Sequence, residues 1–66
     1  MVIKTVIRWP NNMVMVFDHN GEQLPEYQGQ YEVVKEGILR DAPADAAFAH
    51  SVSAAGALRK VPREAW

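Results

Sequence analysis

The sequence predicts an α+β fold: an antiparallel sheet of about four strands with one helix packed on one face, in the order β-β-α-β-β. Two runs rich in β-branched residues precede a single segment of helical periodicity, and two further extended segments follow it. Hairpins that flank a lone helix are typical of this class. No internal repeat, linker or charge block divides the chain, so residues 1–66 are expected to form one small domain.

The first hairpin is predicted from turn residues that separate two extended runs. In residues 1–9 the side chains alternate, which places Ile3 and Ile7 on the same face of a strand. The Pro-Asn-Asn cluster at residues 10–12 favours a tight turn, because proline fixes φ and asparagine tolerates left-handed geometry. Residues 13–18 are then expected to return as the second strand.

A second turn is predicted directly after this hairpin. The segment "DHNG", residues 18–21, ends the strand, with Gly21 at the position expected to need a positive φ. Residues 22–24 form either a short third strand or an extended segment. Acidic and amide side chains alternate here as in a calcium loop, but an EF-hand needs a twelve-residue loop between two helices. We therefore interpret them as turn residues and expect no metal site.

One helix is predicted between residues 27 and 43. Glu36 and Arg40 form a favourable i,i+4 pair on its polar side, and Pro43 ends it. Gly37 lies inside the helix, where it indicates either close approach to a strand or a tolerated position on an exposed flank. The apolar stripe of the helix consists of Tyr31, Val34, Ile38 and Ala42.

The last third of the chain is predicted to form a second hairpin. Residues 44–52 and 57–61 are its strands, residues 53–56 are its turn, and residues 62–66 form one helical turn that begins with Pro62. One face of the first of these strands is expected to carry Phe48, His50 and Val52. The predicted core consists of Ile3, Ile7, Tyr31, Val34, Ile38, Phe48 and Val52.

The small size of the chain predicts association with another chain. A domain of this length buries only about 60% of its unfolded surface and needs a supplement to its core. The sequence has no cysteine, which excludes disulfides and thiolate metal sites, and its histidines and carboxylates show no spacing of a metal cage. No cofactor is expected either. A second subunit is the supplement that remains.

The second strand indicates where such a subunit binds. The run "MVMVF", residues 13–17, is apolar on both faces, and one short helix can cover only one of them. The uncovered face is expected to be an interface, because monomers rarely expose contiguous apolar patches. The alternatives are that the C-terminal segment folds back over this face or that the sheet closes into a barrel. The hairpin register decides which of two alternative sets faces outward, and one of two tryptophans is expected to join it. The candidate interface residues are Val14 and Val16, or else Met13, Met15 and Phe17, with Trp9 or Trp66.

Charge and hydropathy exclude a membrane-spanning chain and argue against a phosphate-backbone partner. The longest uncharged apolar run is five residues, against the roughly 20 that a transmembrane helix needs. Lys4 and Arg8 interrupt any signal-peptide pattern, so we expect a soluble, cytoplasmic protein. The net charge is −1 and the sequence shows no basic stripe that would bind a phosphate backbone.

The sequence gives little support for a catalytic site. His19 and His50 are the candidate general bases. Ser51 adjoins His50, but neighbours on a strand point to opposite faces and cannot form a nucleophile–base pair. The four scattered glycines form no phosphate-binding loop. We expect no catalytic residues.

The sequence therefore predicts a non-enzymatic protein-interaction module, expected to be a homodimer or a small accessory subunit. The alternative is a single-stranded nucleic-acid-binding protein, because the pairs Arg8-Trp9 and Arg63–Trp66 bring cationic and aromatic groups together. Acidic residues outnumber basic ones by eight to seven, which favours the first interpretation.

Overall fold

The computed structural model describes residues 2–53 and 55–66, and it confirms the α+β class, with one helix on a sheet. Met1 in the predicted first strand and Ala54 in the predicted turn of the second hairpin lie outside the described residues. The elements are β1 (Ile3–Arg8), β2 (Met13–Asp18), the 3-10 turn η1 (Pro25–Tyr27), β3 (Gly29–Gln30), α1 (Tyr31–Asp41), β4 (Ala47–Ser51), β5 (Leu58–Val61) and the 3-10 turn η2 (Arg63–Ala65).

The sheet is mixed, not antiparallel throughout, and its described part has five strands where about four were expected. Its order is β3-β2-β1-β4-β5. Three neighbouring pairs are antiparallel, but β1 and β4 run parallel, with Val6 opposite Phe48. Parallel strands cannot be joined by a tight turn and need a longer crossover connection. Here α1 belongs to the connection that leads to β4, so β4 can pair in parallel with β1. The extra strand is the two-residue β3, which precedes α1 directly.

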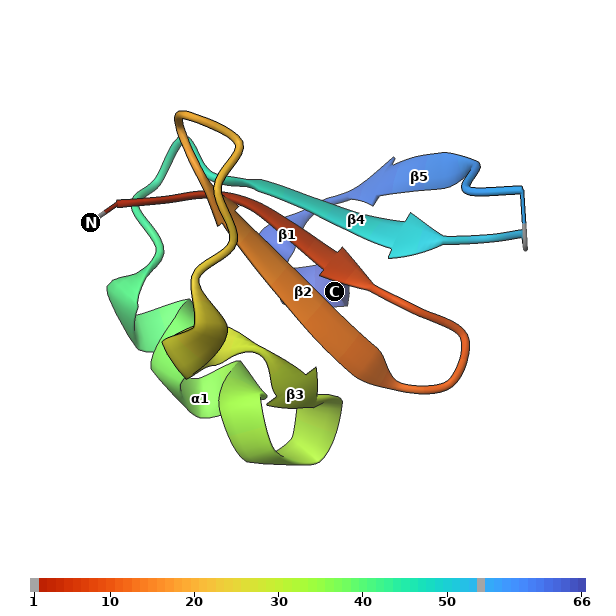
Figure 1. Ribbon diagram of the computed structural model, residues 1–66, viewed down its shortest axis with the longest axis horizontal. Coiled ribbons are helices and arrows are strands. Elements are labelled where there is room, and N and C mark those ends of the chain that lie inside the picture. Colours follow the sequence, from red (N-terminus) through yellow and green to blue (C-terminus); the bar gives the residue numbers. More distant parts are fainter. Residues whose placement is uncertain (1, 54) are drawn as a thin grey trace.

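The helix and the C-terminal segment cover the same face of this sheet. Figure 1 shows α1 on one side of the strands, with the C-terminus behind them. Trp66 joins this layer, because its ring packs edge-on against Tyr31 of α1 and Phe48 of β4, with centroids 5.1 and 5.2 Å apart. We call the covered face the inner face and the opposite one the outer face.

The core lies between the inner face and this layer. Ile38 is the fully buried residue of α1, and Tyr31 and Val34 pack half-buried against the core, so the predicted phase of the helix is right. Burial of a side chain such as Ile38 contributes about 1.5–3 kcal/mol. The buried core residues are Ile3, Val6, Val14, Val16, Leu24, Ile38, Ala42, Phe48 and Trp66.

Two predicted core residues lie elsewhere. The β1–β2 register shifts between Ile3 and Thr5, and this irregularity brings Ile3 to the same face as Val6. Ile7 is therefore on the outer face, buried but outside the core cluster. Val52 is 54% exposed, because β4 ends one residue earlier, beyond the reach of the covering layer.

Both predicted turns around β2 are present. Asn12 has a φ of 68°, and the Asn11 Oδ1 accepts a hydrogen bond from the Met13 amide at 3.1 Å. In the second turn Gly21 has a φ of 80°, the conformation for which its lack of a Cβ is needed. Together these turns fix the two ends of β2.

The C-terminal segment also closes the end of α1. Arg63 donates hydrogen bonds to the carbonyl oxygens of Ala42, at 3.0 Å, and Pro43, at 2.5 Å. Carbonyl groups at a helix end lack partners within the helix, and a cation there also complements the helix dipole.

No helix in the described part of the chain has the length and apolar character needed to cross a bilayer.

Candidate functional site: the outer sheet face

The outer face is built from cross-strand rows of side chains that are uncharged over β1, β2 and β4. The pairing brings Ile7 beside Met15 on one side and Ala49 on the other. Alternation along the strands places the remaining members on the same side. We define the outer face as Thr5, Ile7, Trp9, Met13, Met15, Phe17, Ala47 and Ala49.

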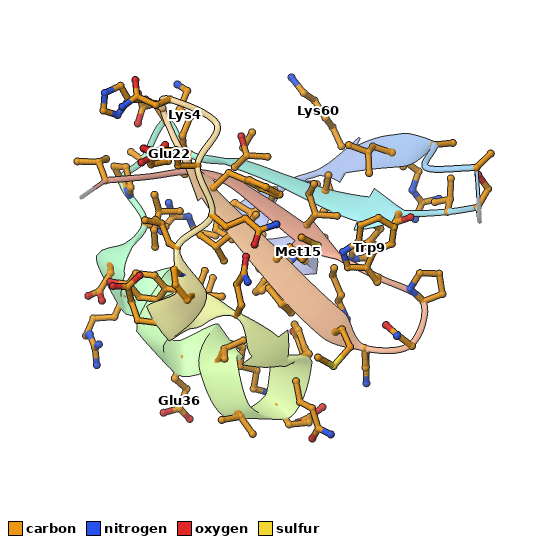
Figure 2. All side chains as sticks on the ribbon, in the orientation of Figure 1. Lys4, Trp9, Met15, Glu22, Glu36 and Lys60 are labelled. Carbon is orange, nitrogen blue, oxygen red and sulfur yellow. The ribbon has the colours of Figure 1, made fainter. Side chains whose placement is uncertain are left out.

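This face is apolar and carries no covering element among the described residues, since α1 and the C-terminal segment both lie on the inner side. Ile7 is nevertheless only 9% exposed, because the longer side chains around it shield it. Met13 is 39% exposed, and Trp9, Met15 and Phe17 are half-buried. Figure 2 shows Trp9 and Met15 close together, away from α1.

Charged groups lie near the β4 and β5 side of this face and not at its centre. Lys60 of β5 lies opposite Ala49, at the end of a row. Figure 2 shows Lys60 pointing away from the sheet on the side opposite Glu36, which lies on the far side of α1. Lys4 pairs with Asp45 at 3.7 Å, between exposed side chains. An uncharged centre with a charged rim is the composition expected of a protein interface.

A pocket of about 510 Å³ opens at the β2–β3 side of the outer face. Trp9, Met13 and Met15 line it together with Gln28 and Gly29. Two of the lining residues each have a side-chain atom that is shielded from solvent and has no hydrogen-bond partner: Trp9 Nε1 and Gln28 Oε1. A buried polar atom without a partner costs about 1–3 kcal/mol, so this pair calls for an explanation.

The structure settles which of the two candidate sets faces outward, although the interface itself stays a prediction. Val14 and Val16 lie under α1 and are at most 1% exposed. Met13, Met15 and Phe17 form the outward set, and Trp9 is the tryptophan that joins them. Trp66 is 4% exposed within the core.

The candidate general bases and Ser51 contact backbone oxygens or face solvent. His50 Nε2 lies 3.2 Å from the backbone oxygen of Trp66, and the Ser51 hydroxyl donates to the Ser53 carbonyl at 3.4 Å. His19 is an exposed turn residue. Residues 2–53 and 55–66 contain no group of three or more histidine, aspartate or glutamate side chains placed to hold a metal ion.

The turn after β2 uses its carboxylate to bind its own backbone. Asp18 Oδ1 accepts hydrogen bonds from the amides of Asn20, at 2.8 Å, and Glu22, at 3.0 Å. This is the Asx-type geometry expected of a turn residue. The predicted alternative of a third strand over residues 22–24 is reduced to a single bridge between Phe17 and Gln23.

The basic and aromatic residues considered for nucleic acid are dispersed over the molecule. Arg8 lies on the inner face, with its guanidinium 3.5 Å from the centre of the Tyr31 ring, whereas Trp9 lies on the outer face. Arg63 binds the end of α1 and Trp66 fills the core. These residues therefore do not form a common stacking surface.

One cluster of ionisable groups lies away from the outer face, at the end of α1. Asp41 accepts hydrogen bonds from Arg40 Nε at 2.9 Å and from the Tyr27 hydroxyl at 2.7 Å. The Arg40 guanidinium, followed by the Tyr27 hydroxyl, lowers the pKa of Asp41. The same contact raises the pKa of Tyr27, because a phenol that donates to a carboxylate holds its proton more firmly.

Sequence reasoning missed Gln28 and Leu24. Both lie in the irregular segment between β2 and α1, where hydrophobic periodicity gives no signal. Leu24 donates its amide to the Val16 carbonyl at 2.9 Å and becomes a core residue. The available signal was one large aliphatic residue, Leu24, in a segment of mostly polar and turn-forming residues.

Comparison of this chain with protein-family models, with curated proteins and with solved structures finds no match.

Proposed function

We propose that this chain is a non-enzymatic interaction module that pairs with a second copy of itself through the outer sheet face. The observation that carries the proposal is an uncharged apolar face left open opposite the helix layer. Contiguous apolar patches larger than a few hundred Å² are rare on monomers and mark interaction sites.

A second copy suits this face for two reasons. Its centre carries no charge, so two identical faces can meet without like-charge repulsion, as a two-fold symmetric contact requires. Two sheets that pack face to face also bury alternate side chains from both, as in β-sandwiches. A standard interface of about 800 Å² per partner would take about a fifth of the 4244 Å² surface of this chain, so it would extend beyond the eight residues of the outer face.

The test is sedimentation equilibrium of the wild type and of Phe17→Glu over micromolar to millimolar concentrations. Phe17 lies on the outer face but outside the pocket beside Trp9, and a glutamate there would lose its hydration at an interface. Val33→Glu is the matched control, because Val33 is 76% exposed on α1. We expect the wild type and Val33→Glu to dimerise and Phe17→Glu to remain monomeric. A monomeric wild type at millimolar concentration would refute the proposal.

A nucleic-acid role has one feature in its favour, the half-buried aromatic residues on the outer face. The eight residues of that face are uncharged and the pairing adds a single cation, Lys60 at the end of one row, which weighs against it. A titration of single-stranded oligonucleotides at two salt concentrations separates the roles, because phosphate-driven binding weakens steeply with salt.

A further inference from the structure

We propose that the free edge of β5 binds an acidic, extended peptide segment of another protein by strand addition. β5 stands at the end of the sheet order, so it pairs with β4 on one side only. Figure 1 shows it on the side of the sheet away from α1. An edge of this kind presents unpaired backbone groups that a further strand can satisfy.

The pairing with β4 identifies which backbone groups are free. The Val52 amide donates to the Ala57 carbonyl at 2.9 Å, and these two residues continue the β4–β5 register. In an antiparallel pair, residues that bond across to each other alternate with residues whose N–H and C=O groups point the other way. Arg59 therefore bonds to β4, whereas Leu58 and Lys60 direct their N–H and C=O groups away from the sheet.

Both ends of this free edge are defined. Gly56 has a φ of 86°, so the extended conformation begins after it. At the other end Pro62 lacks an N–H, and its carbonyl accepts from the Ala65 amide at 2.9 Å. A ligand strand therefore bonds to the backbone of Leu58 and Lys60, each of which offers one donor and one acceptor.

The side chains of β5 specify an acidic ligand. Arg59 and Lys60 are exposed, and neither forms an ion pair with the described residues. Because they are neighbours on a strand, one points to each face of the sheet. Two consecutive acidic residues of an added strand would lie opposite them, and opposite charges across a strand pair stabilise the pairing.

The same two cations argue against a second β5 as the occupant. In a two-fold antiparallel contact each β5 would place its cations against those of the other copy, and like charges directly opposite destabilise a strand pair. Leu58, which is 51% exposed, adds an apolar contact next to Arg59. For a ligand strand antiparallel to β5, the matching sequence is two acidic residues followed by an apolar one.

The first experiment titrates the peptide acetyl-Thr-Glu-Glu-Val-Thr-amide into ¹⁵N-labelled wild type and Phe17→Glu. We expect the backbone amide resonances of Leu58 and Lys60 to move in both proteins, and their amide protons to exchange more slowly with solvent. The amide of Val33, on α1, is the internal control and should stay. No movement at Leu58 and Lys60 up to the solubility limit of the peptide overturns the proposal.

Phe17→Glu separates this edge from the outer face. The substitution disrupts contact through that face, whereas the free groups of β5 lie in the plane of the sheet. Binding that is present in the wild type and lost in Phe17→Glu would assign the peptide to the outer face and overturn the proposal. Equal binding supports it, whether or not sedimentation finds a dimer.

Two N-methylated forms of the peptide test strand addition itself. Methylation of the valine nitrogen removes an N–H that would donate to β5, whereas methylation of the second glutamate removes an N–H that would point away. The first should bind roughly two- to twelvefold more weakly than the parent peptide, as the loss of one net hydrogen bond implies, and the second should bind as well as the parent. Equal affinities of the two methylated peptides overturn the proposal.

A charge reversal tests the preference for acidic residues. Lys60→Glu is compared with Lys35→Glu, which makes the same change in net charge on α1. The affinity ratio between the Glu-Glu peptide and its Lys-Lys counterpart should fall by at least about twofold in Lys60→Glu and stay near the wild-type ratio in Lys35→Glu. An equal fall in both variants would assign the preference to net charge alone and overturn the proposal.

Discussion

The guanidinium of Arg8 lies 3.5 Å from the centre of the Tyr31 ring and joins the end of β1 to the first turn of α1. The same group donates to Asn12 Oδ1 from Nε, at 3.0 Å, and from Nη2, at 2.8 Å. Its Nη1 donates to the backbone oxygen of Trp66 at 2.9 Å. One side chain thus connects the first turn, the helix and the C-terminal segment.

Arg8→Lys is expected to lower the free energy of unfolding by about 1–3 kcal/mol, because an ammonium group reproduces neither the planar stacking nor the forked hydrogen bonds. Urea denaturation measures the change. Arg59→Lys, at an exposed position of β5, is the control and should change stability by less than about 0.5 kcal/mol. Equal changes in the free energy of unfolding for the two substitutions would show that Arg8 does not have this connecting role.

Trp66 is expected to be the most sensitive position of the C-terminal segment. Trp66→Ala removes a ring that is 4% exposed and contacts Tyr31 and Phe48, so it should cost about 3–5 kcal/mol and leave the chain largely unfolded. Trp66→Phe keeps an aromatic ring and also removes the unpartnered Nε1, so it should cost clearly less. Thermal unfolding followed by circular dichroism distinguishes them, and a stable Trp66→Ala protein would contradict this packing.

The cluster at the end of α1 predicts a pH dependence. The pKa of Asp41 is lowered in the folded chain, so its contribution to stability is present above the unfolded pKa of about 3.9 and is lost as the pH falls through the folded value. Arg40→Gln removes the larger cause and Tyr27→Phe the smaller one. Both should raise the pKa of Asp41 in a ¹³C-carboxyl NMR titration, Arg40→Gln by more. An unchanged pKa in both would show that these contacts are absent in solution.

Substitution by alanine at two glycines is expected to change the stability of the protein in opposite directions. Gly37→Ala should stabilise the protein by about 0.5–1 kcal/mol, because the position is helical and an added Cβ would meet Arg40 Nη2 at an ordinary 3.7 Å. Gly21→Ala should destabilise it by about 1 kcal/mol, because alanine is strained at a φ of 80°. Chemical denaturation of both variants checks the signs. A destabilised Gly37→Ala protein would mean that the helix approaches a neighbour more closely than it does here.

Local patterns predicted the elements that depend on local signals. The bounds of β2 and the phase of α1 follow from turn residues and from 3.6-residue periodicity, and both agree with the structure. The faces of β1 did not follow, because the irregularity between Ile3 and Thr5 changes the alternation without a sequence signal. The parallel β1–β4 pair was also missed, because pairing direction depends on how the helix crosses the sheet.

The candidate site was predicted only in part, because it too depends on both local and tertiary features. The run at residues 13–17 indicated that one face of β2 would lack a cover, but the register that selected Met15 over Val16 is a tertiary property. Val16→Glu would therefore place a charge in the core, where Val16 is fully buried, and would not probe an interface. The pairing of Trp9 with Gln28 in one pocket had no sequence signal.

The most direct test of self-association through the outer face is a dilution series of protein labelled with ¹³C at the methionine methyl groups. Met13 and Met15 report from the outer face itself, and the resonances are assigned with Met13→Leu and Met15→Leu. We predict that both methyl resonances shift together as the protein is diluted from millimolar to low micromolar concentration, with a single dissociation constant. In Phe17→Glu they should hold their dilute positions at every concentration. Methyl resonances that do not change with concentration in the wild type, while sedimentation reports a dimer, would place the contact elsewhere and contradict the proposed function.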